Sequence, residues 1–309
     1  MRKNIVTWGE IATLEYGKSL QGYQNSSGEY PVYGTNGQIG RTEKFLSEKP
    51  GVIIGRKGVY RGIHYSKTPF FVIDTAFYLV PKTNQLDLRF AYYQLLTQDI
   101  NGMDSGSAIP STSRDDFYRL EIDLPPLPAQ KRIADILSSL DDKIELNRKM
   151  NSTLEKIGQA IFKHWFVNFE FPNANGEPYR SSGGKMIDSI LGEIPEGWEI
   201  KTLDDVSNVR GGTTPSTSQQ AFWRNGFHHF VTPRDLSKLE VPVLIDTEKK
   251  ITDVGLNEIG SGLLPVGTLL LSSRAPIGYL AISQIPVAIN QGFIGILCDK
   301  GVPNSFMLM

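Results

Sequence analysis

Residues 55–62, GRKGVYRG, form the segment of this chain whose residue types are best suited to contact an anion. Arg56, Lys57 and Arg61 flank Tyr60 between glycines, with no acidic residue among them. Glycine lets a backbone approach a phosphate closely, basic side chains release counterions from DNA, and arginine can read guanine through two hydrogen bonds. The pattern predicts a solvent-facing turn that contacts DNA; the solvated tip of an ordinary hairpin has the same composition.

Polar side chains in other glycine-bearing loops are further candidates for contacts with bases. Asparagine and glutamine suit adenine, and arginine suits guanine. An ordinary turn residue is the alternative at each position. The candidates are Lys18, Gln21, Asn36, Arg41 and Ser107 in the first half of the chain, and Arg274 and Gln291 in the second.

Motifs for catalysis, cofactor binding and metal binding are missing from the sequence. There is no Asn-Pro-Pro-Tyr-type motif of an adenine methyltransferase and no Gly-Lys-Ser/Thr phosphate loop, and GTNGQIG at 34–40 lacks the order of a cofactor fingerprint. His228 and His229 have no cysteine or carboxylate at ligand spacing, and the single Cys298 excludes a cysteine cluster and an internal disulfide. We therefore expect a protein without catalytic activity of its own and without a cofactor or metal.

The length and composition are those of a chain with two folded domains. It has 309 residues, of which 40% are hydrophobic, and a net charge of −1. Bulk positive charge is excluded as the means of binding nucleic acid, so DNA contacts must come from local patches. No apolar run is long enough to cross a bilayer, and the opening MRKNIVTWGE lacks the apolar region of a signal peptide. These features predict a cytoplasmic protein with no membrane partner.

An internal repeat is indicated by two segments, 50–80 and 266–296, that align without gaps. The segments that open with Trp8 and Trp198, each followed by a Thr-Leu-acid triplet, align as the beginnings of the two copies. Short apolar runs bounded by glycine and proline predict strands in both copies, and LRFAYYQLLT at 88–97 predicts a helix. The fold class is therefore α+β.

A long amphipathic helix is predicted between the two copies, from about Ala129 to Phe166, after Pro125, Pro126 and Pro128. At 1.5 Å per residue it would be roughly 55 Å long, too long for one small domain to cover, so it requires a partner helix. Asn147 and Asn151 at the centre of its seam predict a fixed pairing register; a solvent-facing kink is the alternative. The seam follows alternating spacings of four and three, through Ile133, Leu137, Leu140, Ile144, Asn147, Asn151, Leu154, Gly158 or Ile157, Ile161 and Trp165.

The order of three segments resembles the specificity subunit of type I restriction-modification systems: GSAIPSTSRDDFYRLEIDLPPLPAQKRIADI (106–136), the long helix, and LGEIPEGW (191–198). The resemblance implies two target-recognition domains, each followed by a long coiled-coil-forming helix, with the helices antiparallel so that each domain reads half of a split DNA sequence. A full member of the family would continue past position 309, so we expect a truncated second domain and no second long helix. The implied parts are a first recognition domain (1–126), a spacer helix (127–170), a linker (171–197) and a second recognition domain (198–309).

We therefore interpret the chain as the DNA-recognition subunit of such an enzyme. The resemblance implies three partners: double-stranded DNA, methyltransferase subunits that supply the S-adenosylmethionine chemistry, and a restriction subunit that supplies ATP-driven translocation and cleavage. Without a second long helix, the helix at 129–166 is predicted to pair with the same helix of a second copy. Two alternatives stay open: a truncated nonfunctional or regulatory subunit that sequesters methyltransferase, and the recognition part of a fused DNA methyltransferase.

Overall fold

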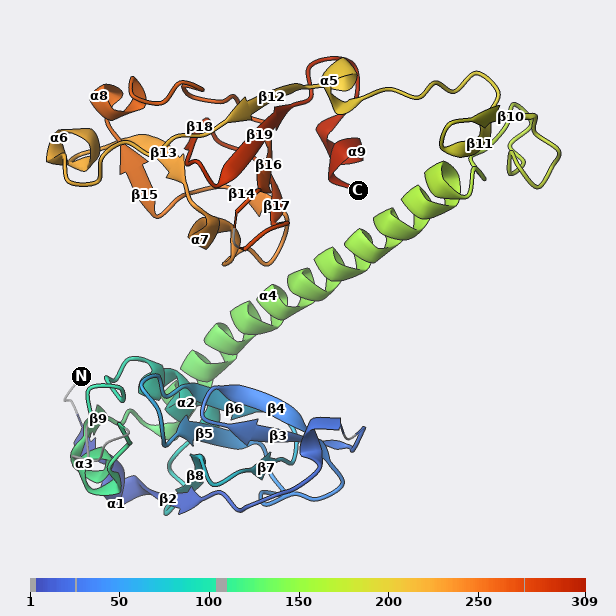
Figure 1. Ribbon diagram of the computed structural model, residues 1–309. Helices are drawn as coiled ribbons and strands as arrows, with labels where there is room; N and C mark the ends of the chain where they lie inside the picture. Colours follow the sequence, from blue (N-terminus) through green and yellow to red (C-terminus); the bar gives the residue numbers. More distant parts are fainter. Residues whose placement is uncertain (1–3, 26, 104–109, 275) are drawn as a thin grey trace. The chain divides into compact units, whose positions relative to one another are not determined.

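The computed structural model describes residues 4–25, 27–103, 110–274 and 276–309. The chain forms two compact units, residues 1–148 and 149–309. The division falls inside the long helix α4 (Leu127–Phe162), so each unit carries part of that helix (Figure 1).

The first unit contains a four-stranded antiparallel sheet in the order β2-β8-β5-β6 and a three-stranded sheet in the order β4-β3-β7, in which β3 and β7 are parallel. Strand β1 pairs with β9. The strands are β1 (Ile5–Thr7), β2 (Ala12–Tyr16), β3 (Tyr30–Gly34), β4 (Gly37–Thr42), β5 (Gly51–Gly55), β6 (Ile63–Ser66), β7 (Phe71–Val72), β8 (Ala76–Pro81) and β9 (Glu121–Asp123), and the helices are α1 (Trp8–Ile11), the 3-10 turn η1 (Tyr23–Asn25), α2 (Leu88–Leu96) and α3 (Arg114–Arg119).

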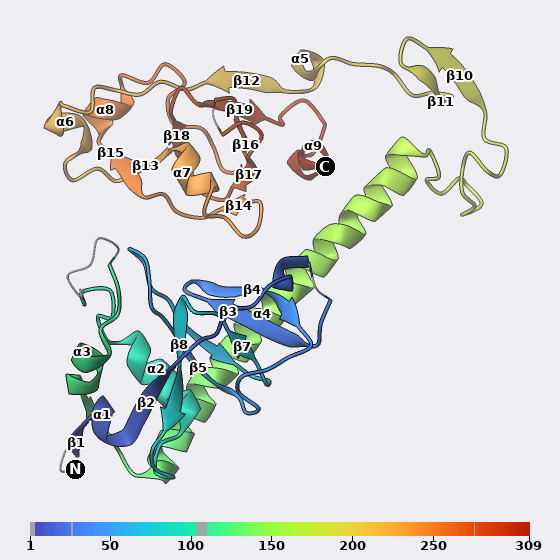
Figure 2. The same ribbon diagram turned by 60° about the horizontal axis from the view of Figure 1, so that its bottom comes forward.

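Strand β5 is buried along its whole length at the centre of this unit. Val52 and Ile54 belong to the core formed with helices α1, α2 and α3, whereas Ile53 belongs to a second core with Val72 of β7. Figure 2 shows β5 and β8 between these helices and strands β3, β4 and β7. Because successive strand residues point to opposite faces, an uninterrupted apolar run is what a strand covered on both faces requires.

The helix predicted at 88–97 is confirmed as α2. Its N-terminus is capped by Asp87, whose carboxylate accepts hydrogen bonds from the backbone N–H groups of Arg89 (3.0 Å) and Phe90 (2.8 Å). Phe90 and Leu95 then turn into the core beneath the sheet. The helix thus presents its other face to the beginning of α4.

A buried glutamine fixes the start of α4. Gln130 is fully buried. Its Oε1 accepts from the backbone N–H of Asp87 (2.9 Å), and its Nε2 donates to the carbonyl oxygens of Gln85 and Pro125 (both 2.8 Å). One side chain therefore joins the first turn of α4, the loop before α2 and the proline segment.

Farther along α4, polar contacts continue along the same side of the first unit. The hydroxyl of Tyr93 donates to Asp141 (2.6 Å), and Lys67 pairs with Asp142 (2.6 Å) and Glu145 (3.0 Å). Burial, together with the hydrogen bond to Asp141, raises the pKa of Tyr93 to about 12. These contacts dock the first half of α4 on α2 and β6.

The second unit repeats the sheets of the first. The order β12-β19-β16-β17 matches β2-β8-β5-β6, with β14 added beside β17, and β15-β13-β18 matches β4-β3-β7, including its parallel pair. The strands are β12 (Asn208–Gly211), β13 (His228–Val231), β14 (Val243–Leu244), β15 (Lys249–Ile251), β16 (Leu269–Ser272), β17 (Leu280–Ser283), β18 (Val287–Ile289) and β19 (Phe293–Leu297), and the helices are α5 (Leu203–Val206), α6 (Gln220–Trp223), α7 (Pro233–Leu236), α8 (Asp253–Leu256) and α9 (Asn304–Leu308).

A matching pair of close backbone approaches supports the same equivalence. A Cβ on Gly17 would lie 1.9 Å from the carbonyl oxygen of Ile73, and a Cβ on Gly212 would lie 2.3 Å from that of Ile289. Ile73 and Ile289 are aligned residues of the predicted repeat. The repeat is therefore confirmed, and both copies require glycine where the first strand passes the loop before the last one.

The alignment of Trp8 with Trp198 is wrong. Trp8 opens α1 after Thr7, whose hydroxyl and backbone N–H bond the Glu10 carboxylate. The same capping arrangement in the second unit joins Thr202 to Asp205, which makes Leu203 the counterpart of Trp8. Trp198 instead stacks on Phe171 (5.4 Å between ring centroids). Trp198 therefore lies five positions before the true counterpart of Trp8, although both tryptophans are followed by a Thr-Leu-acid triplet.

The segment predicted as a linker, 171–197, contains regular structure. Strands β10 (Met186–Ser189) and β11 (Gly192–Pro195) form an antiparallel hairpin. Before the hairpin, Phe171 lies between the rings of Tyr179 (4.7 Å) and Trp198 (5.4 Å), nearly parallel to both. Aromatic stacking therefore orders a segment whose composition is typical of a flexible linker.

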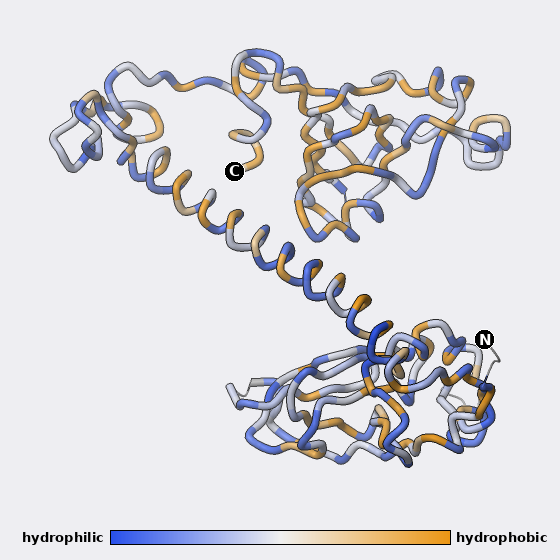
Figure 3. Tube along the Cα trace, turned by 180° about the vertical axis from the view of Figure 1, so that it is seen from behind, coloured by the Kyte–Doolittle hydropathy of each residue, from blue (hydrophilic) through white to orange (hydrophobic). Residues whose placement is uncertain are grey.

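The apolar seam predicted along the long helix is exposed in the single chain. Helix α4 passes into a π-helical turn, η2 (Lys163–Val167). Leu137 is half-buried, and the exposed fractions of the other large apolar residues of the seam range from 38% at Trp165 to 62% at Leu154. Apolar positions recur along the helix in Figure 3. Among the described helices, none is both long enough and apolar enough to cross a membrane.

The last helix of the second unit meets the far end of α4. The aligned segments of the repeat differ by 216 positions. By this offset Asn304, the first residue of α9, corresponds to Leu88, the first residue of α2, and Phe306 corresponds to Phe90. The ring of Phe306 packs on Phe162 and Phe166, with centroids 5.0 Å apart in each pair. In each unit, therefore, the helix that follows the last sheet strand contacts the part of the long helix in that unit.

We predict that Gln130→Leu lowers the free energy of unfolding of the first unit by about 2 to 3 kcal/mol, because it leaves the N–H of Asp87 and two carbonyl groups without partners. Lys131→Leu changes an exposed neighbour and should shift stability by no more than about 0.5 kcal/mol. Urea unfolding with hydrogen exchange of residues 85–95 as the readout measures both. Equal stability of the two variants would contradict this role of Gln130.

Candidate nucleic-acid interface

The basic turn at 55–62 joins β5 to β6 and is held against the turn at 34–37. The N–H of Gly55 donates to the carbonyl of Gly62 (2.8 Å), and the N–H of Gly62 donates to that of Thr35 (3.0 Å). The hydroxyl of Thr35 lies within hydrogen-bond distance of the carbonyls of Lys57 (3.0 Å) and Thr75 (2.8 Å). The structure therefore brings together two loops that are well separated in sequence.

Two further segments complete this loop cluster. The N–H of Gly58 donates to the carbonyl of Pro110 (2.9 Å), and the N–H of Thr112 donates to that of Arg56 (2.9 Å). The N–H of Lys18 donates to the carbonyl of Val72 (2.9 Å). We call the segments 17–18, 34–37, 55–62, 72–76 and 110–112 the first loop cluster; Ser107 lies outside the described residues.

The expectation that all three cations of the basic turn face solvent is wrong for Arg61, which is 1% exposed. Its Nη2 donates to three carbonyl oxygens, and Nη1 donates to Gly58 (2.8 Å). A guanidinium group offers donors in a fixed fork, which suits it to collect several carbonyls. Arg61 therefore ties the turn to the segment after α2 and does not present its charge to a ligand. The carbonyls reached by Nη2 are those of Ile100 (3.0 Å), Asn101 (2.9 Å) and Met103 (2.7 Å).

The other residues of the turn remain available at the surface. Lys57 is exposed, and Val59 and Tyr60 are 83% and 65% exposed. Arg56 is half-buried, and its Nη1 donates to the carbonyl of Asp74 (2.9 Å). An aromatic ring beside cations is a surface that can contact both phosphates and bases.

The remaining candidates of the first unit differ in whether they lie at the loop cluster. Lys18, Gln21 and Asn36 are exposed, and Asn36, with its amide nitrogen directed inward, donates to the carbonyl of Tyr60 (2.9 Å). Arg41 lies farther along β4, where its Nε donates to the carbonyl of Gly28 (2.6 Å) and Nη2 to that of Glu29. The structure thus joins Lys18 and Asn36 to the loop cluster, whereas Arg41 binds the segment before β3.

His64 lies beneath the two central turns. Its ring stacks on Tyr33 with centroids 6.5 Å apart, and a Cβ on Gly62 would lie 2.4 Å from its Nε2. Burial lowers the pKa of His64, an effect that the hydrogen bond with the backbone of Thr35 opposes. The ring is therefore neutral at pH 7, and it packs beneath the loops at 34–37 and 55–62.

The second unit brings its equivalent loops together as well. The N–H of Ser273 donates to the carbonyl of Gly292 (2.8 Å), and the N–H of Thr213 donates to that of Ile289 (3.1 Å). Gln291 accepts a hydrogen bond from Thr214, and Arg274 is exposed in the turn after β16. Both predicted residues of this unit therefore lie in or beside the second loop cluster, defined as residues 212–214, 272–274, 276–278 and 290–292.

His228 and His229 have no carboxylate at ligand spacing in the sequence, but in the structure each lies next to an aspartate. His228 contacts Asp253 (2.8 Å), and His229 contacts Asp246 (3.2 Å). Burial is the main cause that lowers the pKa of His229. Throughout the described ranges, no three histidine, cysteine or acidic side chains are grouped as metal ligands.

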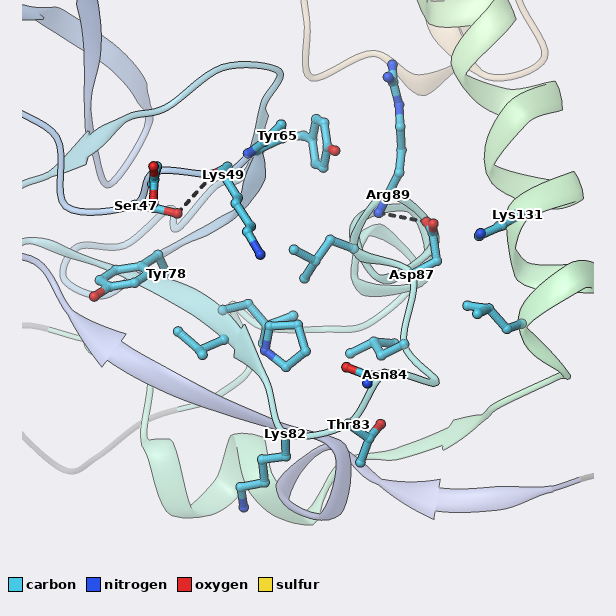
Figure 4. A pocket seen from close by; sticks show the side chains of 18 of the residues that line it. Ser47, Lys49, Tyr65, Tyr78, Lys82, Thr83, Asn84, Asp87, Arg89 and Lys131 are labelled. Atoms are coloured by element: carbon cyan, nitrogen blue, oxygen red, sulfur yellow. Dashed lines mark hydrogen bonds between the residues drawn. The ribbon is translucent and has the colours of Figure 1, made fainter.

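A separate groove of about 870 Å³ lies between the end of β8, α2 and the start of α4. Figure 4 shows Lys49, Lys82, Arg89 and Lys131 around it, together with Asp87, whose carboxylate caps α2. Lys82 donates to the carbonyl of Gly9. The groove shares no lining residue with the first loop cluster, so it marks the junction with the helix and not the predicted recognition surface.

Two residues beside the first loop cluster were missed by sequence reasoning. Tyr16 and Arg114 line a small cavity together with Arg56. Arg114 stands outside the basic and glycine-bearing segments, and Tyr16 is the last residue of a strand before Gly17 and Lys18, so neither residue type nor spacing points to them. Only the meeting of β2, β5 and α3 brings them to the same place.

The family profile for the type I restriction modification DNA specificity domain matches this chain twice, at residues 3–156 and 195–308. The chain belongs to this family. The two matches correspond to the two repeated sheet systems, and the α+β fold is confirmed.

Individual relatives agree with this assignment. The chain is 39% identical over 117 residues to the MjaIX specificity subunit of Methanocaldococcus jannaschii, covering 38% of this chain and 27% of that protein. It is 24% identical over 294 residues to the HindI specificity subunit of Haemophilus influenzae, covering 77% and 63%. The chain thus spans less than two thirds of the length of either relative. The crystal structure of the type I restriction-modification S subunit from M. genitalium has a similar fold, with a TM-score of 0.57 at 19% identity over 97% of this chain and 74% of that one.

We predict that Arg61→Met destabilises the first unit by about 2 to 5 kcal/mol, because two buried and two partly buried carbonyls lose their donor. Lys57→Met, in the same turn but exposed, should change stability by no more than about 0.5 kcal/mol. Thermal unfolding of the two variants, with hydrogen exchange at 99–103, makes the comparison. A stable Arg61→Met protein with unchanged exchange would show that the carbonyl contacts contribute little.

Proposed function

We propose that this chain is a noncatalytic subunit that recognises a DNA sequence for a type I restriction-modification enzyme. The observation that carries the proposal is that each family match contains the same sheets with one loop cluster at their ends. A constant scaffold with different loop side chains is a physical means of reading two different half-sites. Arg56, Lys57, Lys18 and Asn36 are the proposed DNA contacts of the first cluster, and Arg274 and Gln291 those of the second.

The proposed partners follow from the family and from the exposed helix. Methyltransferase subunits would bind the helix and its flanking surfaces and supply the methyl transfer, and a restriction subunit would join the assembly in the cytoplasm. The domain division at 1–126, 127–170, 171–197 and 198–309 belongs to the same proposal. It gives the long helix the role of a spacer between two recognition domains.

We further propose that the exposed seam of α4 pairs with the same helix of a second copy. Its apolar residues lie on one face, and Asn147 and Asn151 near its centre would favour an antiparallel register that satisfies their amides. Such a dimer would hold two identical first recognition domains facing opposite strands of DNA. The recognised site would then be an interrupted palindrome.

Co-expression with a type I methyltransferase subunit, followed by sequencing of methylated positions in genomic DNA, tests the recognition role. We expect a single bipartite motif, and no methylation when either protein is omitted. Replacing Lys57 and Arg56 by glutamine should reduce methylation at the motif, since phosphate contacts supply much of the affinity. Methyl transfer by the purified chain alone, or methylation without a sequence motif, would overturn the proposal.

Sedimentation at micromolar concentration tests the helix pairing. We expect the parent chain to be a dimer and the Ile133→Asp, Leu140→Asp, Leu154→Asp variant to be a monomer, because charges replace the apolar seam. A matched variant with aspartate at Ser139, Ser152 and Gln159 changes exposed positions of the helix outside the seam and should remain dimeric. A monomeric parent chain, or a methylated motif with unrelated halves, would contradict this assembly.

A further inference from the structure

Two guanidinium groups converge on one tyrosine ring at the edge of the first loop cluster. The Cζ of Arg56 lies 4.8 Å from the ring centroid of Tyr16, and the Cζ of Arg114 lies 4.7 Å from it. The three residues come from different elements: Tyr16 ends β2, Arg56 follows β5, and Arg114 begins α3. Their meeting is therefore a product of the tertiary fold.

Backbone carbonyls and rings, not carboxylates, hold both arginines in place. Arg56 donates to the carbonyl of Asp74 (2.9 Å), and Arg114 donates to that of Leu14 (3.3 Å). Phe77 supports the ring of Tyr16 from the core, with centroids 4.9 Å apart. Within the part of the chain that the structure describes, neither guanidinium has a carboxylate oxygen within 4.0 Å.

This arrangement leaves the site with excess positive charge. Two like charges beside one ring repel each other, and the ring and the carbonyl dipoles offset only part of that repulsion. Arg114 is exposed and Tyr16 is 45% exposed, so the charge faces the surface. An anion bound in the cavity that both arginines line would offset this charge.

The space beside the arginines has the size and chemistry for a phosphate group. A cavity of about 330 Å³ is lined by both guanidinium groups and by Ser111, Thr112 and Ser113. The Oγ of Ser113 accepts from the N–H of Asp116 (3.3 Å), so its own hydrogen can point toward a ligand. Asp115 is the single acidic residue of the lining, which makes the cavity net positive.

We propose that Tyr16, Arg56 and Arg114 form a binding site for a backbone phosphate of double-stranded DNA. The proposal rests on the DNA-recognition function argued above and adds Tyr16 and Arg114 to the contacting surface. The cavity adjoins the basic turn, because Thr112, which lines it, is bonded to Arg56 and to Gly55. A phosphate held here would fix the position of the duplex while the turn at 55–62 reaches the bases; the site contributes affinity and orientation without reading sequence.

The salt dependence of DNA binding tests the site directly. Parent and variant chains comprising residues 1–309 are titrated against a fluorescein-labelled duplex of mixed sequence, by anisotropy, at several salt concentrations. For Arg114→Gln we expect an affinity about five- to tenfold lower near 0.1 M salt and a log–log salt slope smaller by about 0.9, the value for one lost phosphate contact. Arg119→Gln is the matched control, because Arg119 lies on the same helix, is 79% exposed and pairs with Asp116 (3.4 Å).

Substitutions of the tyrosine separate the ring from its hydroxyl. Tyr16→Phe keeps the ring under both guanidinium groups and should bind DNA as the parent does, whereas Tyr16→Leu should lose affinity as Arg114→Gln does. Thermal unfolding of each variant identifies any that fails to fold. The motif methylated with the co-expressed methyltransferase subunit should be the same for Arg114→Gln and for the parent.

The outcomes distinguish this site from the function on which it rests. If the parent binds DNA with a steep salt dependence and Arg114→Gln behaves as Arg119→Gln does, the phosphate site is overturned and the recognition function stands. If Arg114→Gln changes the methylated motif, the residue reads bases and the assignment to phosphate is wrong. If the parent chain binds no duplex DNA at low salt, either alone or with the methyltransferase subunit, both proposals fail.

Discussion

The buried guanidinium of Arg61 is the interaction on which the proposed recognition surface depends. A charged group in a protein interior is costly unless it is hydrogen-bonded, and here Nη1 and Nη2 together contact four carbonyl oxygens from two separate segments, whereas Nε is buried with no hydrogen-bond partner among the described residues. The Arg61 side chain therefore links the backbone of the basic turn to the backbone of residues 100–103. The basic turn can be rich in glycine and still keep one conformation, because its anchor lies beneath it.

The two units show how one scaffold can carry different surfaces. Strand order, the parallel strand pair and the close glycine approach are the same in both. The sheets therefore bring three equivalent loops together in each unit: those at 17–18, 55–62 and 72–76 in the first, and those around 212–214, 272–274 and 290–292 in the second. The anchoring differs. In the second unit the hydroxyl of Ser272 bonds the carbonyl of Pro276 (2.8 Å) and accepts from the N–H of Tyr279 (2.8 Å), which closes the turn without a buried charge. Loop chemistry can therefore diverge while the core is retained.

The long helix contacts both units and carries an exposed apolar seam. Gln130 and the polar contacts of Tyr93 and Lys67 fix its first half on the first unit, and aromatic packing with Phe306 engages its far end in the second. These contacts leave the apolar seam exposed. A long helix with an uncovered apolar face is stabilised in water when another helix covers that face. The exposed seam therefore favours association with a partner helix.

The sequence by itself determined the features that are periodic or local. The alternating apolar spacing gave the long helix, the apolar runs and glycines gave the repeat and the α+β class, and the pattern at 88–97 gave α2. Only the tertiary structure decided which cation of the basic turn is buried, that Leu203 and not Trp198 matches Trp8, and that 171–197 is ordered by stacked rings. It also decided that Tyr16 and Arg114 meet Arg56. The physical reason is that helix and strand periodicity arise from neighbours in the chain, whereas burial, stacking and the convergence of charges arise from residues that the fold brings together over about a hundred positions.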